Sequence, residues 1–86
     1  MNKYNLLKNK RVIITGASGG IGKALASGLA DLGAKVGLFS RSEARLSEIV
    51  RDIEESGGQA ILQGGDVQQP SQVQKGLKNL MAGKQG

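Results

Sequence analysis

Short apolar runs alternate with segments of helical spacing along the chain, and this alternation restricts the fold more than any other feature. The runs cover residues 12–15, 35–39 and 60–63. Continuous runs of this kind, rich in Val, Ile and Leu, are typical of strands that are buried in a parallel sheet. The chain is therefore expected to place each run between helices rather than at a half-exposed surface.

Each run is followed by apolar residues three or four positions apart, the spacing of a helix with one apolar face. The predicted apolar positions of the first helix, which should end at a Gly33 cap, are Ile21, Ala24, Leu25, Leu29 and Leu32. Those of the second helix, which should end at Gly57-Gly58, are Leu46, Ile49, Val50 and Ile53. Those of the third helix, which should begin at Pro70 and be weakened by Gly76, are Val73, Leu77, Leu80 and Met81.

The resulting order is β-α-β-α-β-α, which predicts an α/β fold with a three-stranded parallel sheet. Right-handed crossovers give the strand order 3-2-1 and place the first two helices on one face of the sheet. This is part of a Rossmann fold. The third helix of such a fold normally leads to a fourth strand beside the first, and no fourth strand is expected in these 86 residues.

Composition excludes several classes of function. With no Cys and no His, a disulfide framework and a metal site of the zinc type are not expected. The net charge of +5 comes from dispersed residues, and only one Tyr and one Phe are available for stacking on bases, so we expect no nucleic-acid partner. No apolar run approaches the roughly 18 residues of a membrane span, and no secretory signal is recognisable, which favours a cytoplasmic protein.

A glycine-rich turn, TGASGGIG at residues 15–22, joins the first strand to the first helix. Gly16 permits a tight turn off the strand. Gly20 lets backbone N–H groups approach a pyrophosphate without a Cβ in the way, and Gly22 lets the helix pack closely on the sheet. The helix N-terminus adds about half a positive charge facing the anion. The glycine-rich turn lies after a buried strand and before a helix. This position favours a turn that binds a dinucleotide over one whose glycines only allow the chain to turn.

The turn TGASGGIG resembles the cofactor loop of the short-chain dehydrogenase/reductase family. The likeness continues at residues 7–10, 33–36 and 57–60, and is strongest to the 3-oxoacyl-carrier-protein reductase and sugar-alcohol dehydrogenase branches. Asp66-Val67 matches the pair that receives adenine in that family, although such a pair also serves as a strand-to-loop cap. The resemblance implies an N-terminal extension at 1–9, a dinucleotide-binding half-domain at 10–82 and a tail at 83–86.

The resemblance also implies cofactor contacts for particular residues. Beside the three motif glycines, Ser18 would contact a phosphate and Ile21 would pack near the nicotinamide end. At the end of the second strand, where NAD-preferring relatives carry an acid, this chain has Ser40 followed by Arg41. A guanidinium suits a 2′-phosphate, so we favour NADP(H) over NAD(H). The absence of a basic residue at Gly19 argues against this preference.

Two neighbouring features admit an alternative interpretation. Glu43 follows Gly22 at about the distance of a ribose-binding acid. However, Ser40 and Glu43 also have the spacing of a helix capping box, which we prefer. Arg41 itself has a simpler alternative as a solvated residue at the start of a helix.

The catalytic segments of the family, an Asn-Asn-Ala-Gly stretch, a Ser and a Tyr-x-x-x-Lys pair, have no counterpart here. Tyr4 and Lys8 have the Tyr-x-x-x-Lys spacing, but they precede the first strand, at the wrong end of the sheet for catalysis. We expect no catalytic residue in this chain, which is interpreted as the cofactor-binding part of an oxidoreductase. The alternative is a non-enzymatic module that docks onto itself or another protein. In either case the open edge of the first strand favours a homo-oligomer.

Overall fold

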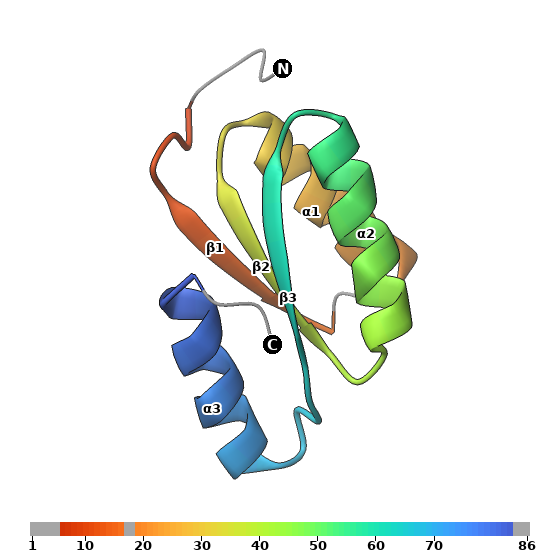
Figure 1. The fold of residues 1–86 in the computed structure, drawn as a ribbon, viewed down its shortest axis with the longest axis vertical. Coiled ribbons are helices and arrows are strands. Elements are labelled where there is room, and N and C mark those ends of the chain that lie inside the picture. Colours follow the sequence, from red (N-terminus) through yellow and green to blue (C-terminus); the bar gives the residue numbers. More distant parts are fainter. Residues whose placement is uncertain (1–5, 17–18, 84–86) are drawn as a thin grey trace.

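The computed structural model describes residues 6–16 and 19–83, which form three strands and three helices in strict alternation (Figure 1). The strands are β1 (Arg11–Thr15), β2 (Lys35–Ser40) and β3 (Gln59–Gly64), and the helices are α1 (Gly20–Asp31), α2 (Glu43–Glu55) and α3 (Pro70–Met81). All neighbouring strands are parallel and β2 is central, in the order β1-β2-β3. The predicted α/β class and strand order 3-2-1 are confirmed.

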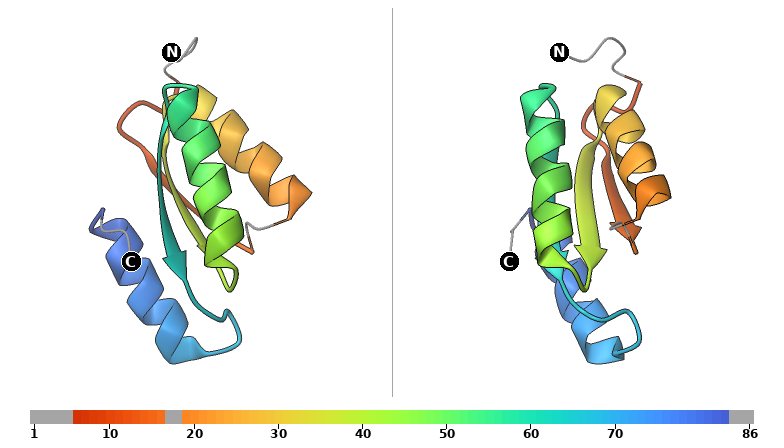
Figure 2. Two further views of the ribbon diagram at one scale, coloured as in Figure 1. Left: turned by 45° about the vertical axis from the view of Figure 1, so that its right-hand side comes forward. Right: turned by 90° about the vertical axis from the view of Figure 1, so that its right-hand side faces the viewer.

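The sheet separates two layers of helices. The left view of Figure 2 shows α1 and α2 on one face of the sheet and α3 on the other. Side chains alternate between these faces along each strand. In β2, Val36 and Leu38 belong to the core beneath α1 and α2, whereas a side chain at Gly37 would contact Leu80 of α3. The central strand is therefore buried on both sides, as expected for a parallel sheet.

The main core lies between the sheet and the α1–α2 layer. Leu46, Ile49, Val50 and Ile53 of α2 are all buried there, as predicted. The predicted apolar face of α1 was partly wrong: Leu29 packs against the core, but Ile21 is 88% exposed and Leu25 is 51% exposed. The buried residues of α1 are Ala26 and Ala30 instead. Ala26 and Ala30, rather than Ile21 and Leu25, therefore mark the side of α1 that meets the sheet.

Helix α3 is held to the sheet by one buried leucine and a polar contact. Leu80 is 3% exposed and packs over Gly37, while Met81 is 65% exposed, which corrects the prediction that Met81 lies on the packed face. The amide of Asn79 donates a hydrogen bond of 3.1 Å to Oε1 of Gln63 on β3. Helix α3 thus covers mainly the carboxyl-terminal half of the sheet on its side.

The segment before β1 is also attached to the core. The backbone N–H of Leu7 donates to the carbonyl of Leu32 at 2.8 Å, and the Leu7 side chain packs against the main core. Within the described part of the chain, no helix is long and apolar enough to cross a membrane.

Candidate functional site

The residues singled out in the sequence lie at one edge of the sheet. Gly16 follows β1, Ser40 ends β2 with Arg41 directly after it, and Asp66 follows β3 by two residues. All three strands are parallel, so their carboxyl ends meet at the same edge. In open α/β sheets this is the edge at which ligands bind.

Gly16 makes the turn that starts this edge. Its φ is +65°, a left-handed conformation that disfavours any residue with a Cβ. Its N–H donates to the carbonyl of Phe39 at 2.9 Å, which extends the β1–β2 pairing by one residue before the chain turns. The predicted role of Gly16 as the turn glycine is thus supported by its backbone geometry.

The start of α1 is open. Gly19 is the N-cap and has no side chain with which to cap the helix, and α1 has no acidic residue in its first turn. Apart from the adjacent residues and the helix's own backbone, no described atom lies within 4 Å of a Cβ built on Gly19 or Gly20. The first N–H groups of α1 therefore lie beside accessible space, and the helix dipole favours an anion there. Gly22 is half-buried and Ile21 is exposed, while the predicted phosphate contact Ser18 lies outside the described residues.

At the end of β2, a buried and an exposed residue stand side by side. Ser40 is 7% exposed, and its Oγ accepts a hydrogen bond of 3.4 Å from the N–H of Ser42. Arg41 is exposed, so its guanidinium can reach a ligand at the sheet edge. Ser40 consequently shapes the turn into α2, while Arg41 supplies positive charge.

The predicted capping box was wrong. Helix α2 begins at Glu43 with Ser42 as its N-cap, so Glu43 is the first residue of the helix and not the third. From that position its side chain extends toward β3, and a Cβ built on Gly64 would overlap the Glu43 carboxylate. Glu43 is therefore an acidic group at the carboxyl edge of the sheet, beside the residues predicted to bind the cofactor.

Asp66 organises the loop between β3 and α3. Its Oδ1 accepts a hydrogen bond of 2.9 Å from the N–H of Gln68, and its own N–H donates to Oε1 of Gln72 at 2.8 Å. Its carboxylate thus makes the loop contact that the alternative interpretation predicted. One carboxylate oxygen makes this contact, and the adjacent Val67 is 52% exposed. Both residues of the pair remain at the sheet edge.

Sequence reasoning missed a small cavity of about 170 Å³ beside the glycine turn. Its lining residues are Gly19, Gly20, Lys23, Arg45, Glu48 and Ile49. Lys23 also forms an ion pair of 3.2 Å with Asp52 of α2. Lys23 lies one turn into α1, and Arg45 lies near the start of α2. These positions are the sequence signal that could have indicated two cations near the glycine turn.

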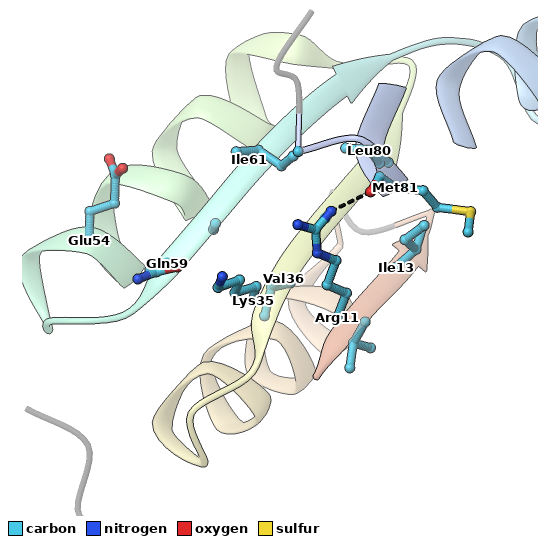
Figure 3. Close-up of a pocket in the computed structure, with 13 residues that line it drawn as sticks. Arg11, Ile13, Lys35, Val36, Glu54, Gln59, Ile61, Leu80 and Met81 are labelled. Atoms are coloured by element: carbon cyan, nitrogen blue, oxygen red, sulfur yellow. Dashed lines mark hydrogen bonds between the residues drawn. The ribbon is translucent and has the colours of Figure 1, made fainter. Parts of the chain in front are cut away.

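A larger groove of about 550 Å³ lies elsewhere, between α3 and the amino-terminal half of the sheet (Figure 3). Ile13, Gly37, Ile61 and Leu80 contribute to its lining, and at its rim the Arg11 guanidinium donates to the carbonyl of Met81. None of the predicted cofactor residues lines it. Among the described residues no group of three or more His, Cys, Asp or Glu side chains could hold a metal ion.

Comparisons with known proteins agree with this architecture. Over 61 residues the chain is 51% identical to an uncharacterized oxidoreductase of Listeria monocytogenes, a match that covers 71% of this chain and 25% of that protein. Its structure resembles that of a citronellol catabolism dehydrogenase of Pseudomonas aeruginosa, with a TM-score of 0.89 and 30% identity, over 95% of this chain and 34% of the other.

A metagenomic short-chain oxidoreductase in complex with NADP is similarly close, with a TM-score of 0.84 and 32% identity, over 90% of this chain and 35% of that one. The chain thus spans about a quarter of the length of the Listeria protein and about a third of these structures. Residues 10–85 match the family model described as short chain dehydrogenase. The chain therefore belongs to the short-chain dehydrogenase family.

Proposed function

We propose that this chain binds the dinucleotide cofactor of a short-chain oxidoreductase along the carboxyl edge of its sheet, and that it prefers NADP(H) to NAD(H). In this proposal the pyrophosphate lies against the turn formed by Gly16, Gly20 and Gly22, with Ser18 as a hydroxyl contact. The adenosine lies toward β2 and β3. The dinucleotide, when bound, supplies or accepts the hydride.

The observation that carries the proposal is the empty space in front of Gly20. Gly20 is the first residue of α1, and its φ lies outside the positive range that requires glycine. A Cβ there would meet no described atom within 4 Å. Gly28 has the same open surroundings, but Gly20 is the first residue of α1 and stands at the carboxyl edge of the sheet, where ligands of open α/β sheets bind. A pyrophosphate at a helix N-terminus needs that space.

The adenosine contacts are proposed from residues at the next two strand ends. Arg41 is exposed where a 2′-phosphate would lie, and Ser40 holds the turn that positions it. Asp66 and Val67 lie beyond β3, where the adenine would be received. The NADP complex of the metagenomic relative supports this cofactor class. Glu43 opposes the preference, because a carboxylate near a 2′-phosphate repels it.

Calorimetric titration of the 86-residue chain with NADPH tests the proposal. Gly20→Ala should leave the free energy of unfolding unchanged or slightly higher, because its Cβ faces open space, but should weaken NADPH binding about tenfold or more by displacing the pyrophosphate. The matched control is Gly28→Ala in the same helix, where a Cβ also meets no described atom within 4 Å. It should leave binding unchanged. Absence of saturable binding to the unsubstituted chain would favour the docking module instead.

For the longer proteins of this family we propose that this part serves as the cofactor-binding half of an enzyme. There the hydride would pass between nicotinamide and a carbonyl or alcohol, with the protein positioning the cofactor rather than performing the redox chemistry itself. No catalytic residue is assigned in this chain.

A further inference from the structure

The small cavity beside the glycine turn lies between the beginnings of α1 and α2. Gly19 and Gly20 line it from α1, and Arg45 and the buried Ile49 line it from α2. Gly20 is the first residue of its helix and Arg45 is the third residue of its own. Because α1 follows β1 and α2 follows β2, the cavity lies at the carboxyl edge of the sheet, where the dinucleotide is proposed to bind.

The size of this cavity suits one substituent of a ligand. Pockets that hold a whole small molecule measure about 300–1,000 Å³. This one measures about 170 Å³, which is room for several water molecules or for a single phosphate group. Apart from the adjacent residues and the helix's own backbone, no described atom lies within 4 Å of a Cβ built on Gly19. The α1 side of the cavity is therefore open.

Arg45 is the cation of this cavity that is left for a ligand. The other cation, Lys23, is held by its ion pair with Asp52. Among the residues that the structure describes, Arg45 forms no ion pair, although Glu48 lines the same cavity three residues further along α2. Arg45 also stands in the first turn of α2, where the helix dipole disfavours a positive charge. Its charge therefore does not serve to stabilise α2.

We infer that this cavity receives the 2′-phosphate of NADP(H) and that Arg45 is a second specificity-determining residue beside Arg41. The inference rests on the proposed function. A phosphate monoester carries about −1.5 to −2 charges at pH 7, which is more than one guanidinium neutralises. Arg41 does not line the cavity. Arg41 therefore contacts the phosphate from outside the cavity, and Arg45 contacts it from the α2 wall.

This arrangement answers the argument that Gly19 raises against NADP(H). Position 19 carries no basic side chain, but Gly19 faces the same cavity as Arg45. The positive charge thus enters from α2, and the glycine leaves room for the phosphate. Glu48 lies on the same wall as Arg45 and repels the phosphate, so the two side chains should act on NADPH affinity in opposite directions.

Calorimetric titration of the 86-residue chain with NADPH and NADH tests the role of Arg45. Arg45→Ala should weaken NADPH binding about tenfold and leave the affinity for NADH within about twofold. The matched control is Arg51→Ala, because Arg51 is an exposed arginine of the same helix that does not line the cavity. This control should change neither affinity. Thermal unfolding followed by circular dichroism verifies that both variants fold.

The titrations separate failure of this inference from failure of the proposed function. If the unsubstituted chain binds NADPH, but Arg45→Ala changes neither affinity or lowers both equally, the inference is overturned and the proposed function stands. If the unsubstituted chain binds neither cofactor, the proposed function is wrong and the inference falls with it.

A rescue variant separates a charge in the cavity from a structural role of Arg45. In the Arg45→Ala chain, Gly19→Arg supplies a guanidinium from the α1 side and should restore NADPH affinity to within about threefold of the unsubstituted chain. Gly19→Met adds length without charge and should restore nothing. Glu48→Gln in the unsubstituted chain should raise NADPH affinity about two- to fivefold. Restoration by Gly19→Met, or no restoration by Gly19→Arg, would overturn the inference.

Inorganic phosphate distinguishes a nucleotide subsite from a site for free phosphate. The ribose holds the 2′-phosphate beside the cavity, so phosphate alone should bind at least about 100-fold more weakly than NADPH. Phosphate binding as tight as that of NADPH, and lost in Arg45→Ala, would identify free phosphate as the ligand and overturn the inference.

Discussion

The ring of Phe39 occupies the space into which any side chain at Gly76 would point. A Cβ built on Gly76 would overlap the ring and would lie 2.8 Å from its Cδ1 atom. Phe39 is 1% exposed and is the largest fully buried side chain of the central strand. Gly76, which the sequence predicted to weaken α3, is thus the residue that lets α3 approach β2.

We predict that Gly76→Ala lowers the free energy of unfolding by about 1–2 kcal/mol. Overpacking against Phe39 should outweigh the gain of up to about 1 kcal/mol in helix propensity. Urea unfolding followed by circular dichroism, at a concentration where the chain is monomeric, measures the change. In Gly28→Ala the same propensity gain is unopposed, so this control should be about 0.5–1 kcal/mol more stable. A similar gain in Gly76→Ala would show that α3 is not held closely to Phe39.

The elements were predictable because glycine and proline mark their ends. Gly16, Gly33 and Gly57 all have positive φ, and each stands where a strand or helix was predicted to stop. Pro70 is the first residue of α3, as predicted. At these positions the residue type itself restricts the backbone, so the local sequence is sufficient.

The faces of α1 and the start of α2 were not predictable in the same way. The spacing of Ile21 and Leu25 is helical, but spacing alone does not tell which side of α1 meets the sheet, and Ala26 and Ala30 are the residues buried there. Likewise, Ser40 and Glu43 fit a capping box, yet β2 extends through Ser40 and delays the helix. Both outcomes depend on tertiary contacts that no short segment contains.

Arg41→Ala should separate the two cofactors. If the guanidinium makes charge-assisted hydrogen bonds to the 2′-phosphate, its loss costs about 1.5–3 kcal/mol toward NADPH and little toward NADH. Calorimetric titration of both cofactors checks this. The control is Arg51→Ala, which removes an exposed arginine in α2 and should change neither affinity. Equal losses for NADPH and NADH would show that Arg41 does not recognise the 2′-phosphate.

Glu43→Gln should raise the affinity for NADPH several-fold and leave the affinity for NADH within about twofold. The carboxylate lies over Gly64, near the proposed adenosine site, so its removal reduces repulsion of a 2′-phosphate. The same titrations measure both values. A clear loss of NADH affinity would instead identify Glu43 as the acid that binds the ribose, and the proposed preference for NADP(H) would then be wrong.

Asp66→Asn should preserve the structure of the loop between β3 and α3 but weaken the binding of the dinucleotide. The asparagine side-chain oxygen can still accept the hydrogen bond from the N–H of Gln68, so thermal unfolding should change little. The amide NH2 that replaces the second carboxylate oxygen only donates and cannot accept from adenine, and one lost hydrogen bond of about 0.5–1.5 kcal/mol predicts an affinity about 2- to 12-fold weaker for both cofactors. Unchanged affinity would show that Asp66 does not bind adenine and serves only to hold the loop through Gln68.

The 86-residue chain should bind NADPH without oxidising it in the presence of carbonyl substrates. Hydride transfer to a carbonyl must be accompanied by a proton, and general acid catalysis contributes about 10²–10⁴-fold to such steps. The chain has no His or Cys, and its single tyrosine, Tyr4, precedes β1 in the sequence and lies outside the described residues, whereas the proposed cofactor site follows the carboxyl ends of the strands. Loss of NADPH absorbance with a panel of ketones measures turnover. Turnover that disappears in Tyr4→Phe would contradict the prediction and would assign Tyr4, with Lys8, a catalytic role.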